Sequence, residues 1–296
     1  MIDTPWCINH SKVLPQTQAA ANEYLQSLQV SKRSEATIKK YRSILQRFFI
    51  ECPKELTDLT PEDILLWLRT TYGEKKERTM ELVITVLSNF FTFCLEEEYV
   101  HKVLVKSRWR PKIPKSLPKF LNRNELARVK FQADLLPLRE RVLVAFLLTS
   151  GCRRSEAAGI NLEDVDLKSQ TAIVLGKGKR IRKVHFSIEC ALLLKQYLTE
   201  RTADSPALFL DKNGQRVKPG GIYRLTRKVG KKAGLLARFS PHVCRHTFAT
   251  NLLSRGAELE FIGDELGHRD LNTTRTYART LSEQIIRAYK SKMGNV

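Results

Sequence analysis

Three short clusters in the second half of the chain combine basic and histidine side chains that could act on a phosphate group. Arg153 follows an apolar helical pattern, at a predicted junction between two helices. Lys177 lies between two glycines in a predicted hairpin turn, from which it can reach a nucleic-acid backbone phosphate. His242 and Arg245 are three residues apart and therefore share one face of a predicted helix. Taken alone, the first two clusters are also consistent with a solvated arginine pair and a basic hairpin tip.

Zinc binding is the main alternative chemistry for the third cluster. His242 and His246 are four residues apart, but Val243 stands where the zinc proteases of the H-E-x-x-H type carry glutamate. We therefore expect His246 to have a structural role and the chain to need no metal and no cofactor. The carboxylates are predicted to lie on solvated faces or at helix starts rather than in a metal cluster; those considered are Glu163, Asp164, Asp166, Glu258, Glu260, Asp264 and Glu265. The six cysteines include no C-x-x-C pair and are predicted to be reduced core thiols.

Charge points to a polyanionic partner. The 296 residues include 51 Lys and Arg against 31 Asp and Glu, a formal net charge of +20. The surplus is uneven, because residues 116–296 hold 33 basic against 17 acidic side chains and residues 1–115 hold 18 against 14. No apolar run approaches 18 residues, and the first residues lack a signal-peptide pattern. We expect a cytoplasmic, nucleoid-associated protein that binds nucleic acid and no membrane.

Hydrophobic periodicity predicts a mainly α protein with a small antiparallel β-sheet (α+β). Helical patterns cover residues 19–29, 34–49, 60–69 and 77–99, which predicts a four-helix bundle. After a basic, proline-containing stretch come helices over 123–132, 139–149, 189–201, 221–233, 241–255, 258–266 and 282–292, and a hairpin of strands 171–175 and 182–186. We expect three parts: a helical domain over 1–111, a linker over 112–119, and a mixed helical domain over 120–296.

The clusters together resemble the tyrosine recombinase (phage integrase) family, of the Xer-like two-domain type. The resemblance is carried by five motifs in the family's order: Arg153, Lys177, the H-x-x-R of His242 and Arg245, the L-G-H ending at His268, and Tyr277 nine residues later. It extends over essentially the whole chain. It implies a core-binding, DNA-binding bundle over 1–111 and a catalytic domain over 120–296. Cys244, Ser150 and Arg154 depart from the family pattern, but none of them removes a catalytic group.

The resemblance implies metal-free phosphoryl transfer to and from a tyrosine. Tyr277 would be the nucleophile that forms a 3′-phosphotyrosyl link and frees a 5′-hydroxyl. Arg153 and Arg245 would clamp the non-bridging phosphate oxygens, because guanidinium groups match that geometry. Lys177 would protonate the leaving 5′-oxygen.

The remaining site residues would support these groups. By the same resemblance, His242 would assist proton transfer at Tyr277, His268 would donate a hydrogen bond to the phosphate, and Glu156 would orient the site around the first arginine. Further DNA contacts are expected from surface cations, namely Lys115, Lys119, Arg154, Lys179 and Arg180.

The implied function is site-specific DNA recombination through a Holliday junction, by a tetramer on two double-stranded DNA sites. The tetramer could be a homotetramer or a heterotetramer with a related recombinase. Only about 16 residues precede the first predicted helix, which favours an Xer-like or transposon resolvase type over an integrase with an accessory-site domain. An integrase of a phage or mobile element stays open. A type IB topoisomerase and a catalytically idle DNA-binding regulator are disfavoured by the H-x-x-R and L-G-H contexts and the intact residue set. The apolar face of Ile285, Ile286 and Tyr289 could dock on its own protomer or on a neighbour.

Overall fold

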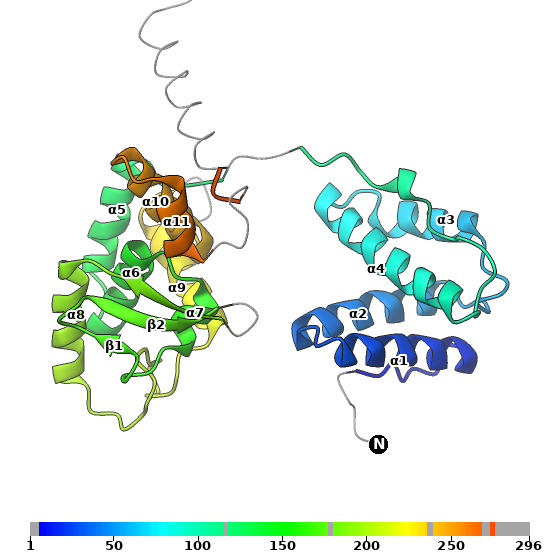
Figure 1. Ribbon diagram of the computed structural model, residues 1–296, viewed down its shortest axis with the longest axis horizontal. Coiled ribbons are helices and arrows are strands. Elements are labelled where there is room, and N and C mark those ends of the chain that lie inside the picture. Colours follow the sequence, from blue (N-terminus) through cyan, green and yellow to red (C-terminus); the bar gives the residue numbers. More distant parts are fainter. Residues whose placement is uncertain (1–5, 115–117, 177–179, 236–238, 268–272, 276–296) are drawn as a thin grey trace, which may run out of the picture. The chain divides into compact units, whose positions relative to one another are not determined.

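The computed structural model describes residues 6–114, 118–176, 180–235, 239–267 and 273–275. The chain divides into two compact units, Met1–Lys115 and Ser116–Val296. Within the described residues the fold is mostly helical, with one small antiparallel sheet (Figure 1). The predicted α+β class is therefore confirmed.

Within residues 6–114, the first unit has four α-helices and a short 3₁₀ helix. These elements are α1 (Pro15–Val30), α2 (Glu35–Glu51), α3 (Pro61–Tyr72), α4 (Glu77–Glu96) and η1 (Ser107–Trp109). Local sequence explains the helix starts: the Ser34 hydroxyl accepts a hydrogen bond from the Thr37 N–H, and Thr60 and Asp63 form a capping box. Helix α4 ends at Glu96, three residues before the predicted end, and Glu98 adopts a φ of 60°.

Aromatic side chains fill the core of this unit. Phe48, Phe49, Phe90 and Phe91 are all buried, and the Phe49 and Phe90 rings meet edge to face at 5.5 Å. Helix α4 is long and apolar enough to cross a membrane by length and composition alone. Its apolar side chains, from Val83 to Cys94, are part of this core cluster, as expected for the central helix of a bundle.

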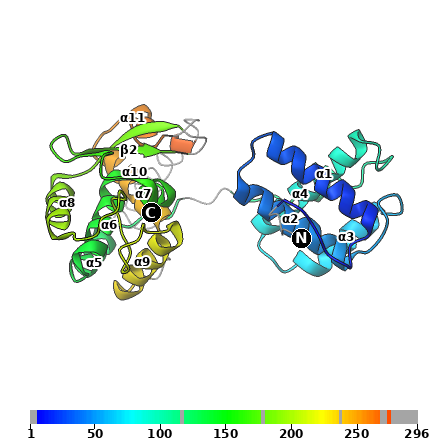
Figure 2. The same cartoon turned by 90° about the horizontal axis from the view of Figure 1, so that it is seen from below.

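The second unit is built around the apolar helix α6 (Leu138–Ser150). Helices α5 (Arg123–Asp134), α8 (Ile188–Glu200) and α10 (Pro241–Ser254) contact α6 (Figure 1 and Figure 2). The sheet has the order β1 (Val165–Asp166), β2 (Thr171–Leu175), β3 (Ile181–His185). The other helices in the described part of this unit are α7 (Arg154–Gly159), α9 (Pro219–Lys232) and α11 (Leu259–Leu266).

The predicted hairpin is present with small differences. Strands β2 and β3 pair antiparallel from Thr171 opposite His185 to Leu175 opposite Ile181, so β3 begins one residue before its predicted start. Strand β1 was not predicted, because two residues are too short to show alternation. The predicted helix over 282–292 lies outside the described residues. All six cysteines are free, and Cys94, Cys152, Cys190 and Cys244 are buried, in keeping with core thiols.

Candidate active site

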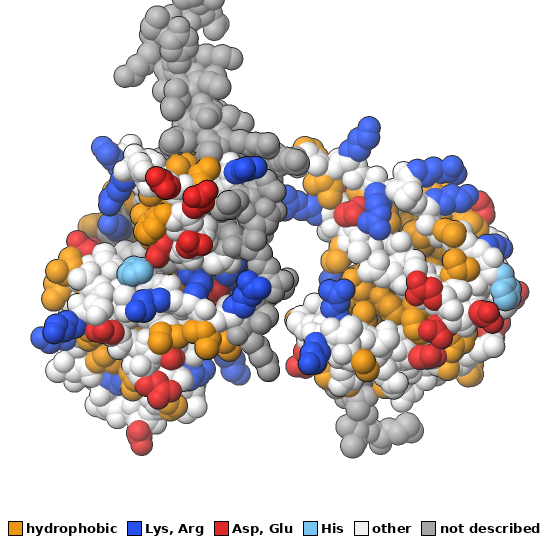
Figure 3. Space-filling view, in the orientation of Figure 1, with side chains coloured by type: hydrophobic (Ala, Val, Ile, Leu, Met, Phe, Trp, Pro, Cys, Tyr) orange, Lys and Arg blue, Asp and Glu red, His pale blue; other side chains and the backbone are white. Residues whose placement is uncertain are grey.

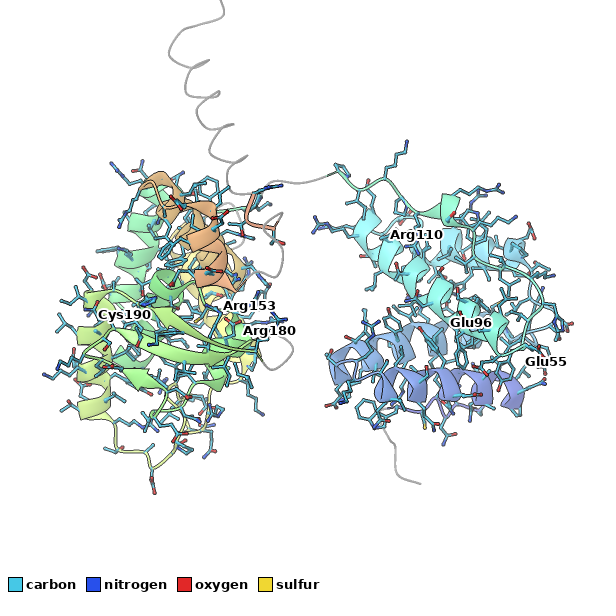
Figure 4. The ribbon with its side chains drawn as sticks, in the orientation of Figure 1. Glu55, Glu96, Arg110, Arg153, Arg180 and Cys190 are labelled. Atoms are coloured by element: carbon cyan, nitrogen blue, oxygen red, sulfur yellow. The ribbon has the colours of Figure 1, made fainter. Side chains whose placement is uncertain are left out.

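The junction between α6 and α7 holds Arg153. Gly151 ends α6 in the left-handed conformation, with a φ of 60°, which is a common way for a helix to stop. Arg153 is the N-cap residue of α7, and its backbone N–H donates to Glu156 Oε2 at 2.9 Å. Its guanidinium Nη1 donates to the other oxygen of the same carboxylate at 2.6 Å. Figure 4 labels Arg153 next to Arg180 in the second unit. Glu156 therefore holds both the backbone and the side chain of Arg153.

Glu156 is a buried carboxylate that joins two arginines. Only 1% of its side chain is exposed, and Arg182 of β3 donates from Nη2 to Oε2 at 2.8 Å. Burial alone would raise the pKa of the Glu156 carboxyl, but the hydrogen bond from the Arg153 N–H, the Arg182 charge and the Arg153 guanidinium lower it overall. Glu156 is consequently ionised at neutral pH.

Three arginines converge on the carbonyl oxygens at the end of α11. Arg182 Nη1 donates to Glu265 O. Arg245 Nη2 donates to Leu266 O at 2.5 Å, and Arg153 Nη2 lies 3.4 Å from Gly267 O. The C-terminal end of a helix carries partial negative charge, so it favours guanidinium groups. The end of α11 is therefore a shared contact of these three arginines.

Arg245 links the end of α11 to the junction between α6 and α7. It is 4% exposed, and its Nη1 donates to Gly151 O at 2.9 Å. Because α10 begins at Pro241, with Ser240 as its N-cap, His242 lies in the first turn and Arg245 one turn later. The structure thus brings Arg153, Arg245 and the buried Glu156 together.

Both histidines of α10 favour the neutral form. His242 is exposed at the surface, but partial desolvation, followed by the charges of Arg154, Arg245 and Arg153, lowers its pKa below the ordinary value of 6.5. Burial, with smaller contributions from His242 and Arg245, lowers the pKa of His246 to about 4.

The hairpin base adjoins the same carboxylate. Gly176 precedes Lys177, and a Cβ on Gly176 would lie 3.5 Å from Glu156 Oε1. The Gly176 N–H donates to Arg180 O at 2.7 Å, which closes the base of the hairpin. Arg180 itself is exposed.

The remaining predicted site residues fall into two groups. Lys119 is exposed, and the guanidinium of the exposed Arg154 lies over the Tyr223 ring, 5.9 Å from its centroid. Figure 3 shows Lys and Arg side chains on the face near α7 and the β2–β3 hairpin. Five predicted residues lie outside the described residues: Lys115, Lys177, Lys179, His268 and Tyr277.

The structure corrects one interpretation of the acidic residues. Glu265 was expected on a solvated face, but it is only 8% exposed, because it faces β3, and its Oε1 lies 2.8 Å from His185 Nδ1. Asp164 accepts a hydrogen bond from the backbone N–H of Asn161. Asp166 accepts hydrogen bonds from the backbone N–H groups of Lys168 and Ser169. Among the residues that the structure describes, no group of three or more His, Cys, Asp or Glu side chains is placed to hold a metal ion.

Sequence reasoning assigned no role to Arg182. A usable signal was present in the strand pattern, because residue 182 shares the inward face of β3 with the buried Val184. A cation on an inward face requires a buried acceptor, and Glu156 supplies it from 26 residues away.

Comparison with known proteins identifies the family. The phage integrase family model matches residues 119–284, and the model of the phage integrase N-terminal SAM-like domain matches residues 21–98. The chain belongs to the phage integrase family, the tyrosine recombinases, which confirms the resemblance.

Relatives with Xer names match most of the chain. Tyrosine recombinase XerA of Pyrococcus horikoshii is 32% identical over 268 residues, which cover 89% of this chain and 90% of the relative. Tyrosine recombinase XerC of Oceanobacillus iheyensis is 31% identical over 291 residues, covering 93% and 95%.

Solved structures share the fold. XerH bound to palindromic difH substrate, a post-cleavage complex, is 22% identical with a TM-score of 0.75 and covers 97% of this chain and 92% of that chain. A lambda integrase fragment, in a dimer bound to a COC′ core site, is 18% identical with a TM-score of 0.73 and covers 88% and 94%.

Proposed function

We propose that this protein is a site-specific DNA recombinase that cuts and rejoins strands through a 3′-phosphotyrosyl intermediate at Tyr277. The observation that carries the proposal is the convergence of Arg153 and Arg245 on the end of α11, with Glu156 buried behind them. Two guanidinium groups held in fixed positions suit a phosphate with developing negative charge. Membership of the tyrosine recombinase family supports the same assignment.

The reaction is a pair of transesterifications. The Tyr277 phenolic oxygen attacks the scissile phosphorus, the bond to the 5′-oxygen breaks, and the phosphate becomes esterified to tyrosine. A 5′-hydroxyl of the partner strand then attacks this ester and releases Tyr277. Each step exchanges one ester bond for another, so no external energy source is consumed.

Charge stabilisation is the task of the two arginines. The transition state spreads negative charge over the non-bridging oxygens, which Arg153 and Arg245 contact. By analogy with a single oxyanion-hole donor, each arginine contributes about 3 kcal/mol. Glu156 contacts no substrate and acts by holding Arg153 in place.

Proton transfer is assigned to three further side chains. His242, whose pKa is lowered, is neutral at neutral pH and can accept the Tyr277 proton. Lys177 protonates the leaving 5′-oxygen, and His268 donates a hydrogen bond to the phosphate. The reaction uses no metal and no cofactor, so cleavage is expected to persist in EDTA.

The partner is double-stranded DNA carrying two specific sites, bound by a homotetramer or by a heterotetramer with a related recombinase. The net charge of +20 supports a DNA partner, and backbone contacts are assigned to Lys115, Lys119, Arg154, Lys179 and Arg180. We therefore expect the affinity for DNA to fall steeply as the salt concentration rises. A cytoplasmic, nucleoid-associated location fits this substrate.

An Xer-like role in resolving replicon dimers or cointegrates is the preferred biological assignment, because the curated relatives described above carry Xer names at about 30% identity. Integration of a mobile element is the second candidate.

A plasmid assay tests the proposal. The recombination site is first selected from genomic fragments of the source by retention on the protein, and two direct copies are cloned into one plasmid. The wild type is expected to resolve this plasmid into two circles, and Tyr277→Phe to leave it intact. Relaxation of a supercoiled plasmid without sites would instead indicate a type IB topoisomerase. DNA binding without any strand cleavage would indicate a regulator.

A further inference from the structure

Glu265 and His185 form a hydrogen-bonded contact outside the groups assigned to the reaction. Glu265 Oε1 lies 2.8 Å from His185 Nδ1; the Glu265 side chain is 10% exposed and the His185 side chain 58% exposed. Glu265 Oε2 is buried and has no hydrogen-bond partner among the described residues. Because an isolated buried carboxylate is costly, the contact with His185 is the main compensation that this side chain receives.

The contact joins two elements that have little apolar surface in common. Helix α11 packs on α10 in a small hydrophobic cluster, formed by Ala249 of α10 with Ile262 and Leu266 of α11, which is separate from the main core of the unit. Strand β3 contributes Val184 to the main core. The contacts between α11 and β3 include two polar ones, Arg182 with the Glu265 carbonyl and His185 with the Glu265 carboxylate, and the second is a link between two side chains.

The backbone of Glu265 is also linked to the proposed catalytic arginines by hydrogen bonds. The Glu265 carbonyl accepts from Arg182, which in turn binds Glu156, the residue that holds Arg153. The next carbonyl, Leu266 O, accepts from Arg245. A displacement of the last turn of α11 would therefore move the partners of both arginines at once.

We propose that His185 and Glu265 are a positioning pair for strand cleavage: their hydrogen bond holds the last turn of α11 on β3 and thereby places Arg153 and Arg245 around the scissile phosphate. The inference rests on the proposed function. Neither residue touches the phosphate, so the pair acts on the rate of chemistry and leaves DNA affinity unchanged.

The effect of Glu265 on stability can be separated from its effect on the cleavage rate. Breaking a buried pair is costly when the partner left behind is itself buried, but the His185 side chain is 58% exposed, and Glu265 Oε2 is buried with no hydrogen-bond partner among the described residues. Glu265→Met is therefore expected to unfold at the same or a higher temperature than the wild type, although it lacks the hydrogen bond. A loss of cleavage rate in such a protein could not arise from unfolding.

The test is single-turnover cleavage of a nicked duplex that carries the selected site, with protein in saturating excess. Glu265→Met is expected to lower the cleavage rate constant about tenfold or more, because small misplacements of catalytic groups are costly. Its DNA Kd and melting temperature should match those of the wild type or improve. Glu265→Gln keeps an oxygen that accepts from His185 and should recover most of the rate. Glu260→Gln, the same change at an exposed site of α11, is the matched control and should behave as wild type.

A double-variant cycle completes the test. His185→Ala should slow cleavage in the wild-type background but have little further effect when combined with Glu265→Met. Wild-type rates in Glu265→Met, or a rate loss that follows the melting temperature or the DNA Kd, would overturn the positioning role. Failure of the wild type to form any covalent adduct would instead overturn the proposed function, and the inference with it.

Discussion

Arg153 and Glu156 are joined twice, once through the backbone N–H of Arg153 and once through its guanidinium group, to the two oxygens of one carboxylate. The first contact is the N-terminal cap of α7, and the second is an ion pair with a side chain that is 1% exposed. One buried carboxylate thus starts the helix and fixes the direction of the arginine. The guanidinium is already ordered before a phosphate arrives, which lowers the entropy lost on binding.

Removal of the Glu156 carboxylate should damage both stability and cleavage. Glu156→Ala leaves Arg182, whose side chain is 13% exposed, without its carboxylate, and a broken buried pair costs about 3–5 kcal/mol. Urea unfolding of the variant measures this loss, and covalent-adduct formation should fall with it. The exposed Glu163→Ala is the control and should stay within about 0.5 kcal/mol of the wild type. Equal stabilities for both variants would refute the structural role of Glu156.

His246 should make the protein less stable in mild acid. Its folded-state pKa of about 4 lies below the ordinary 6.5, so the unfolded chain binds a proton that the folded chain does not between these values. Stability is complete above about pH 6.5 and falls as the pH decreases toward 4, by on the order of 3 kcal/mol. Urea unfolding across this range, compared with His246→Gln, measures the effect. An equally steep decline in the variant would assign the pH dependence to other groups.

The charge of Arg154 should tune the pH profile of cleavage. Since Arg154 contributes to lowering the pKa of His242, Arg154→Gln should raise it. If neutral His242 accepts the Tyr277 proton, the acidic limb of the rate profile moves to higher pH in the variant. Cleavage rates at saturating DNA across the acidic range measure the shift. Lys183→Gln, which removes another exposed cation, should leave the limb in place; a shift of the same size there would argue against a local effect.

Gly151 should tolerate no side chain. At its φ of +60°, a Cβ would lie 2.5 Å from Phe248 Cδ1 and 3.0 Å from Leu266 Cδ2. Gly151→Ala should cost about 1–3 kcal/mol and displace the carbonyl that Arg245 binds, so cleavage should fall as well. The matched control is Gly159→Ala, where a Cβ meets no atom within 4 Å and the change should be neutral or stabilising by about 0.4–1 kcal/mol. Thermal unfolding of both variants distinguishes these cases, and equal effects would contradict the steric argument.

Local chemistry in the sequence explains which elements were predicted well. Thr60 and Asp63 predict the start of α3, and Gly151 predicts the end of α6, because helix caps depend on neighbouring residues alone. The glycines around Lys177 likewise indicate the hairpin. Candidate catalytic residues came from the order of the family motifs, and the structure brings Arg153 and Arg245 to the end of one short helix.

Contacts between residues far apart in the chain could not be predicted from the sequence. Glu265 and His185 are 80 residues apart, and nothing in the pattern around Glu265 distinguishes a buried carboxylate from a solvated one. Arg182 was placed on the hairpin, but its bond to Glu156 depends on how β3 lies against α7. Side-chain partners of this kind follow from tertiary contacts, which periodicity does not specify.

Formation of a covalent bond between Tyr277 and DNA tests the central claim most directly. A nicked duplex with the selected site traps the intermediate, because the short strand beyond the cleaved bond diffuses away. The wild type should give an SDS-resistant protein–DNA adduct, in EDTA as well as without it, and peptide mapping should find the phosphate on Tyr277. Tyr277→Phe should bind the same duplex with unchanged affinity and give none. An adduct from Tyr277→Phe, or none from folded, DNA-bound wild type, would contradict the account.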